Sequence, residues 1–155
     1  MSTQQPDPSG STADREFVHS RLIDAPRERV YRAFSDPAHL ARWWGPKGFS
    51  STFHEFDLRA GGAWRFILHG PDGKNYPNES IFKEVVPQER VVFEHTLGHH
   101  FWMTITFEAQ GEKTLVGWRQ VFDTAAEVQR IAPIVTEANE QNLDRLAAEV
   151  RNVTA

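Results

Sequence analysis

The stretch that most constrains the fold is the last one, residues 133–151, where apolar side chains recur at three- and four-residue steps. This spacing places them on one face of a helix. Pro133 suits the first turn of such a helix, because its missing N–H would be unpaired there anyway. A helix of this length has to bury its apolar stripe against another element. The predicted buried face consists of Val135, Ala138, Asn139, Asn142, Leu143, Leu146, Ala147 and Val150.

Most of the chain upstream has the two-residue period of β-strands. Residues 15–23 form a first predicted strand, and residues 24–34 and 37–44 form two short helices, the first capped by Asp24 or Ala25. After residue 50 the apolar alternation continues to residue 122 with no helical interruption, so the strands should be mainly antiparallel. We therefore predict an α+β fold, in which a curved sheet of about six to seven strands surrounds the C-terminal helix.

The register of the central strands follows from burial. Residues 101–107 alternate cleanly between apolar and polar side chains. A three-residue turn at residues 97–99 places His95 opposite Phe101, whereas a two-residue turn would place Glu94 opposite Met103 and bury a carboxylate. We therefore predict the three-residue turn.

Several polar side chains fall on the predicted inward face of the sheet and helix. A loop at residues 110–113, for example, places Gln120 opposite Met103. Aromatic walls with a few convergent polar groups are typical of ligand pockets. The alternative is that each polar group hydrogen-bonds a neighbour in a packed core. The candidate ligand-binding residues are His54, Trp64, Phe66, Phe93, His95, Phe101, Met103, Trp118, Gln120, Asn139 and Asn142.

Composition excludes several classes of function. The chain has 155 residues, a net charge of −4 and no cysteine, so it has no basic footprint for nucleic acid, no disulfide and no thiolate metal site. Adjacent His99 and His100 would point to opposite faces of a strand, and we expect neither a metal nor a cofactor. No apolar run reaches membrane-spanning length and no signal peptide is evident, which predicts a cytoplasmic protein that does not bind a membrane. Residues 1–14 are polar and predicted to be a disordered tail, and residues 15–153 a single domain.

Three segments resemble a known family: APRERVYRAFSDPAHLARWWGPKGFS, FDLRAGGAWRFILHGPDGKNY and NLDRLAAEV. They look like the bacterial homologues of the heat-shock-protein-90 ATPase activator, within the START/polyketide-cyclase-like (SRPBCC) superfamily. The resemblance runs from about Arg15 to Val150. It implies a helix-grip fold with the order strand, two helices, six strands and a long C-terminal helix, and a cavity for hydrophobic ligands between sheet and helix. It carries over no catalytic residue.

Three functions remain open at this point. Binding of a hydrophobic or aromatic small molecule ranks first. A cyclase- or hydrolase-type enzyme using His54 or His95 as general acid or base ranks second, because imidazole titrates near neutral pH. A chaperone-associated partner-binding module ranks third. Trp43 and Trp44 are predicted to close one mouth of the pocket or, alternatively, to form a partner surface. The expected oligomeric state is a monomer or a weak homodimer.

Overall fold

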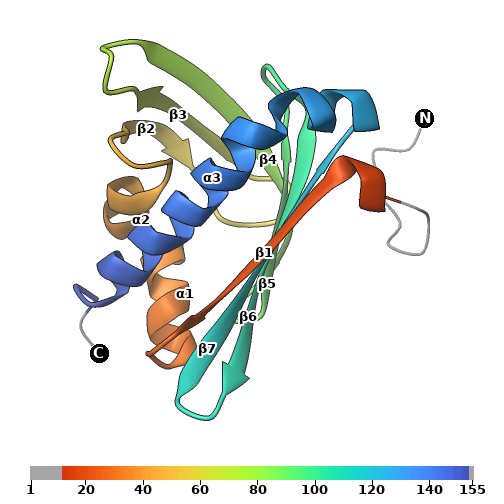
Figure 1. Ribbon diagram of the computed structural model, residues 1–155. Helices are drawn as coiled ribbons and strands as arrows, with labels where there is room; N and C mark the ends of the chain where they lie inside the picture. Colours follow the sequence, from red (N-terminus) through yellow and green to blue (C-terminus); the bar gives the residue numbers. More distant parts are fainter. Residues whose placement is uncertain (1–11, 154–155) are drawn as a thin grey trace.

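The computed structural model describes residues 12–153 (Figure 1). After a 3-10 helix, η1, the chain follows the predicted order of one strand, two short helices, six strands and a long helix. The elements are η1 (Ala13–Arg15), β1 (Glu16–Ile23), α1 (Arg27–Ser35), α2 (Pro37–Trp43), β2 (Ser50–Phe56), β3 (Ala63–His69), β4 (Asn75–Val86), β5 (Arg90–His95), β6 (Phe101–Gln110), β7 (Lys113–Phe122) and α3 (Ala125–Val150).

The seven strands form one antiparallel sheet in the order β1-β7-β6-β5-β4-β3-β2. Helix α3 crosses one face of this curved sheet, and α1 and α2 lie beside its C-terminal half (Figure 1). The predicted α+β helix-grip arrangement is therefore confirmed.

The predicted register of the central strands is also confirmed. His95 lies opposite Phe101, and Met103 lies opposite Gln120. The connection between β5 and β6 comprises residues 96–100 and is longer than the predicted turn, but its centre is unchanged, so the same side chains face inward.

Helix α3 begins earlier than predicted. Its first residue is Ala125, and the side chain of Thr124 caps it by accepting a hydrogen bond from the backbone N–H of Glu127 at 3.1 Å. Pro133 therefore lies inside the helix and not in its first turn, and α3 changes direction between its first turns and the remainder (Figure 1). A proline inside a helix removes one backbone hydrogen bond, which accounts for such a bend.

The two short helices begin at different kinds of cap. Asp36 accepts a hydrogen bond from the N–H of Ala38 at 3.0 Å and starts α2 with Pro37 in the first turn, as predicted. The cap of α1 is Pro26 and not Asp24 or Ala25, and no side chain bonds its first turn.

One continuous cluster of buried side chains joins the sheet to all three helices. Leu143, Leu146 and Val150 contribute the predicted stripe of α3, each no more than 2% exposed. The largest fully buried side chains from the other elements are aromatic: Phe34, Trp43, Trp64, Phe82, Phe93 and Trp118.

The last part of the predicted N-terminal tail contacts the sheet through Thr12. Residues 1–11 of the predicted tail lie outside the described residues. Thr12 is buried, and its hydroxyl donates to Glu16 and accepts from Arg119. Thr12 of the predicted tail therefore packs against β1 and β7. Among residues 12–153, no helix is long and apolar enough to cross a membrane.

Candidate functional site

The concave face of the sheet holds most of the predicted site residues. Trp64, Phe66, Phe93, Met103 and Trp118 are each at most 3% exposed and belong to the main core cluster. Phe101 is half-buried at its edge. These side chains therefore lie together on the concave face, and other side chains pack densely on them.

His54 does not belong to this face. A β-bulge between Phe53 and Glu55 takes His54 out of the strand alternation, and its side chain is exposed. Phe53 packs against the core in its place. The predicted inward position of His54 was wrong for this reason.

His95 is buried and engaged by protein groups at both ring nitrogens. Nδ1 lies 2.6 Å from the carbonyl oxygen of His99, and Nε2 lies 2.8 Å from Oδ1 of Asn78. The ring stacks on Phe101 with centroids 4.5 Å apart. Burial lowers the pKa of His95, and the hydrogen bond to the carbonyl of His99 partly opposes this effect.

The three predicted amides also have protein partners. Nδ2 of Asn139 donates to Oε1 of Gln120 at 3.1 Å, and Nδ2 of Asn142 donates to the carbonyl of Trp43 at 2.8 Å. These bonds join α3 to β7 and to α2, and they match the packed-core alternative for these residues.

Three other polar atoms on the concave face lack any partner among the described residues: Nε1 of Trp64, Oγ of Ser80 and Nε1 of Trp118. Ser80 lies opposite both Trp64 and His95 in the sheet. Ser80 was not among the predicted site residues, although its place two residues before Phe82 puts it on the same face of the strand. Buried polar atoms without partners are uncommon in native proteins and call for an explanation.

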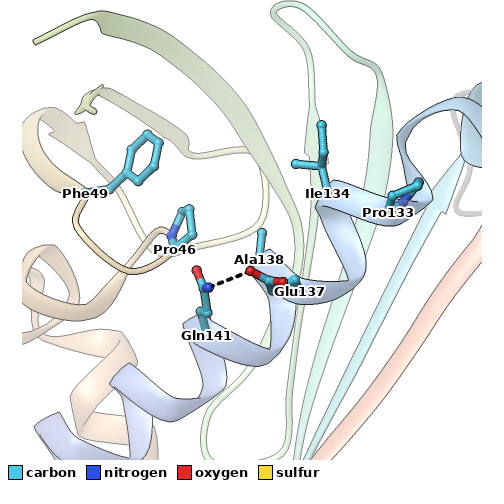
Figure 2. Close-up of a pocket in the computed structure, with 7 residues that line it drawn as sticks. All are labelled: Pro46, Phe49, Pro133, Ile134, Glu137, Ala138 and Gln141. Atoms are coloured by element: carbon cyan, nitrogen blue, oxygen red, sulfur yellow. Dashed lines mark hydrogen bonds between the residues drawn. The ribbon is translucent and has the colours of Figure 1, made fainter. Parts of the chain in front are cut away.

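A groove of about 340 Å³ opens between α3 and the loop that joins α2 to β2 (Figure 2). Its walls are largely apolar, and Ile134 is 74% exposed. Glu137 and Gln141 supply a polar pair on one side, where the Gln141 amide donates to Glu137 at 3.2 Å. The lining residues are Pro46, Phe49, Pro133, Ile134, Glu137, Ala138 and Gln141.

We name residues 44–49 the tryptophan loop, because Trp44 inserts from it into the core. The loop is tied to α3 by polar groups. Arg145 Nη1 donates to the carbonyls of Gly45 and Pro46, both at 2.9 Å, and the N–H of Lys47 donates to the Gln141 side chain at 3.1 Å. Burial lowers the pKa of Arg145. One wall of the groove is thus held in place by hydrogen bonds to the helix that forms the other wall.

No group of three or more His, Asp or Glu side chains within residues 12–153 is arranged to hold a metal ion.

The curved antiparallel sheet, the long helix across it and the two short helices after the first strand define a helix-grip protein. The chain belongs to the family described as Activator of Hsp90 ATPase homolog 1-like protein, whose model matches residues 24–151. The resemblance expected from the sequence motifs is confirmed.

Solved bacterial structures share the fold. A protein from Chromobacterium violaceum is 30% identical, with a TM-score of 0.75 over 86% of this chain and 95% of that one. A protein from Nitrosomonas europaea is 19% identical, with a TM-score of 0.83 over 90% of this chain and 96% of that one. A protein from Arthrobacter aurescens is 20% identical, with a TM-score of 0.84 over 92% of this chain and 89% of that one. A search of curated proteins found no match.

Proposed function

We propose that this protein binds a hydrophobic or aromatic small molecule between α3 and the sheet, with the groove beside the tryptophan loop as its entrance. The observation that carries the proposal is the groove itself, with apolar walls and one polar pair. Concave, mostly apolar sites with a few polar groups are the usual form of small-molecule sites. The volume of about 340 Å³ suits a ligand of modest size.

The buried aromatic floor supports the same proposal. Trp64, Phe93 and Trp118 lie behind the tryptophan loop, and the two indoles hold N–H groups that no described residue uses. A ligand that reached this floor would gain contact with aromatic surface and with unused donors. We retain the predicted residues of the concave face and α3 as candidate ligand contacts, apart from the exposed His54.

Catalysis by the two predicted histidines receives less support. His54 is exposed on the edge strand β2, away from the core cluster. Both ring nitrogens of His95 contact protein groups. A general acid or base needs a nitrogen within hydrogen-bond reach of the reacting group.

The experiment is a thermal-shift screen of aromatic and polyketide-like compounds. A compound at a hundred times its Kd should add about 2.7 kcal/mol to the free energy of unfolding. The Ala138→Trp variant fills the groove and should abolish the shift, whereas Ala148→Trp, at an exposed position on the same helix, should preserve it. Equal shifts in both variants would exclude the groove as the site, and no shift with any compound would count against ligand binding.

A further inference from the structure

Trp44 occupies a cage of aromatic side chains at the centre of the concave face. Its ring centroid lies 4.9 Å from that of Trp64, 5.5 Å from Trp118 and 6.0 Å from Phe93. Trp44 itself is 9% exposed. Unlike these neighbours, which belong to strands of the sheet, it projects from the loop after α2.

Two side chains of the cage carry a hydrogen-bond donor that is left unpaired within residues 12–153. The indole N–H groups of Trp64 and Trp118 have no partner among the described residues, nor has the hydroxyl of Ser80 opposite Trp64. Trp43 provides an internal comparison, because its indole N–H donates to the carbonyl of Ala33 at 2.8 Å. If this core served only packing, the indole N–H groups of Trp64 and Trp118 would be expected to have hydrogen-bond acceptors, as that of Trp43 has.

The segment that carries Trp44 is held by hydrogen bonds at its edges. Arg145 and Gln141 on α3 bind the tryptophan loop, and Gly45 and Gly48 have φ angles of 105° and 88°, which favour glycine. Pro46 and Phe49 of the same loop line the groove in Figure 2. The groove wall and Trp44 therefore belong to one loop, so an outward movement of this loop would displace both.

We infer that Trp44 occupies the place of the ligand, which is a planar bicyclic aromatic molecule bearing an oxygen acceptor and binds between Trp64, Phe93 and Trp118 when the tryptophan loop moves outward. This inference rests on the proposed function and specifies its ligand class. An indole fits the cage by its flat shape, but its own N–H is a donor and cannot accept from Trp64 or Trp118. A carbonyl oxygen on the ligand can accept a hydrogen bond from either indole. A cation, which aromatic cages also bind, would meet the positive ends of these N–H groups.

The test compares indane with 1-indanone, which share a bicyclic framework close in size to indole and differ by one carbonyl. Binding to the Trp44→Ala variant is measured by equilibrium dialysis. We expect 1-indanone to bind at least about fivefold more tightly than indane, the lower end of what a rescued buried donor provides. Adding Trp64→Phe or Trp118→Phe should reduce this preference. Adding Trp102→Phe, which removes a tryptophan paired with the outward-facing Glu94, should not.

The intact loop supplies a second arm that does not depend on the stability of Trp44→Ala. Arg145→Gln removes bonds to the tryptophan loop and should tighten binding of 1-indanone relative to the wild type. Arg130→Gln, at an exposed position on the same helix, should leave it unchanged.

The outcomes separate the two proposals. Equal affinity of Trp44→Ala for indane and 1-indanone, or a preference that survives both Trp→Phe changes, overturns this inference. The proposed function still stands in that case if the wild type binds aromatic compounds in the groove. A third outcome is that only Trp44→Ala binds a compound, whereas the wild type and Arg145→Gln bind none. The cavity would then have been created by Trp44→Ala, and both proposals would fail. If Trp44→Ala does not fold, unchanged affinity for 1-indanone in Arg145→Gln overturns the inference.

Discussion

Gln120 on β7 and Asn139 on α3 hydrogen-bond to each other across the sheet–helix interface, with 3.1 Å between Oε1 and Nδ2. Both side chains are less than 10% exposed. A buried polar pair inside an apolar interface is satisfied in only one alignment of the two elements, because sliding the helix would leave both amides unpaired. This bond therefore helps to set where α3 lies along the sheet.

A double-mutant cycle tests this role. Gln120→Leu and Asn139→Leu should each lower the free energy of unfolding by about 1–3 kcal/mol, because each leaves the other amide buried without its partner. The double variant should lose less than the sum, by about 0.5–3 kcal/mol. Urea unfolding measures all three. Additive losses would show that the bond does not stabilise the interface.

Leu146 tests the assignment of the buried face of α3. The side chain is 1% exposed, so Leu146→Ala should lower the free energy of unfolding by about 2–5 kcal/mol. Leu97→Ala is the matched control at a side chain that is 40% exposed, and it should cost about 0.5 kcal/mol or less. Similar losses in the two variants would contradict the assignment.

The strand register could be predicted because one face of each strand is apolar and a shift by one residue would bury charges such as Glu94. The position of His54 could not be predicted, because the β-bulge depends on how β2 pairs with β3 and leaves no clear pattern in the local sequence. The start of α3 was predictable in principle. Thr124 and Glu127 have the spacing of a capping box, but Pro133 suggested a later start.

The candidate site was predicted only in outline. Aromatic side chains on alternate strand positions identified the floor of the concave face. One partner of His95 is a carbonyl in the β5–β6 connection, and the partner of Asn142 is a carbonyl at the end of α2. Backbone positions of this kind emerge only from the folded chain. The same holds for the unpaired indole of Trp118, because no sequence pattern distinguishes it from the satisfied indole of Trp43.

His100 should make stability depend on pH above neutrality. Desolvation lowers its pKa, but hydrogen bonds to Glu94 at 2.6 Å and Asp123 at 2.7 Å outweigh this effect and raise the pKa above 6.5. A raised folded-state pKa gives stability that is complete below the unfolded value and is lost as pH rises through the folded value. The free energy of unfolding should therefore fall as pH rises above about 6.5.

Thermal or urea unfolding across this pH range should show the loss in the wild type and a flatter profile in His100→Gln. The effect should be small, because solvent screens a partly exposed side chain. His95 provides a contrast, since burial lowers its pKa and its contribution is lost as pH falls below 6.5. His95→Phe should therefore leave the slope above pH 6.5 in place. A slope that His100→Gln does not change would exclude His100 as its source.

Gln88 is the non-glycine residue with a left-handed backbone among residues 12–153, with φ of 64° in the turn between β4 and β5. This conformation brings Cβ close to the following carbonyl, and glycine avoids that contact. Gln88→Gly should therefore raise the free energy of unfolding by about 0.5–1 kcal/mol, after the greater flexibility of glycine in the unfolded chain is counted. Glu89→Gly is the control in the same turn, where φ is not positive and only the flexibility changes, so this variant should be less stable than the wild type. Urea unfolding of both variants decides the matter, and equal destabilisation by the two would show that Gln88 is not strained in the native turn.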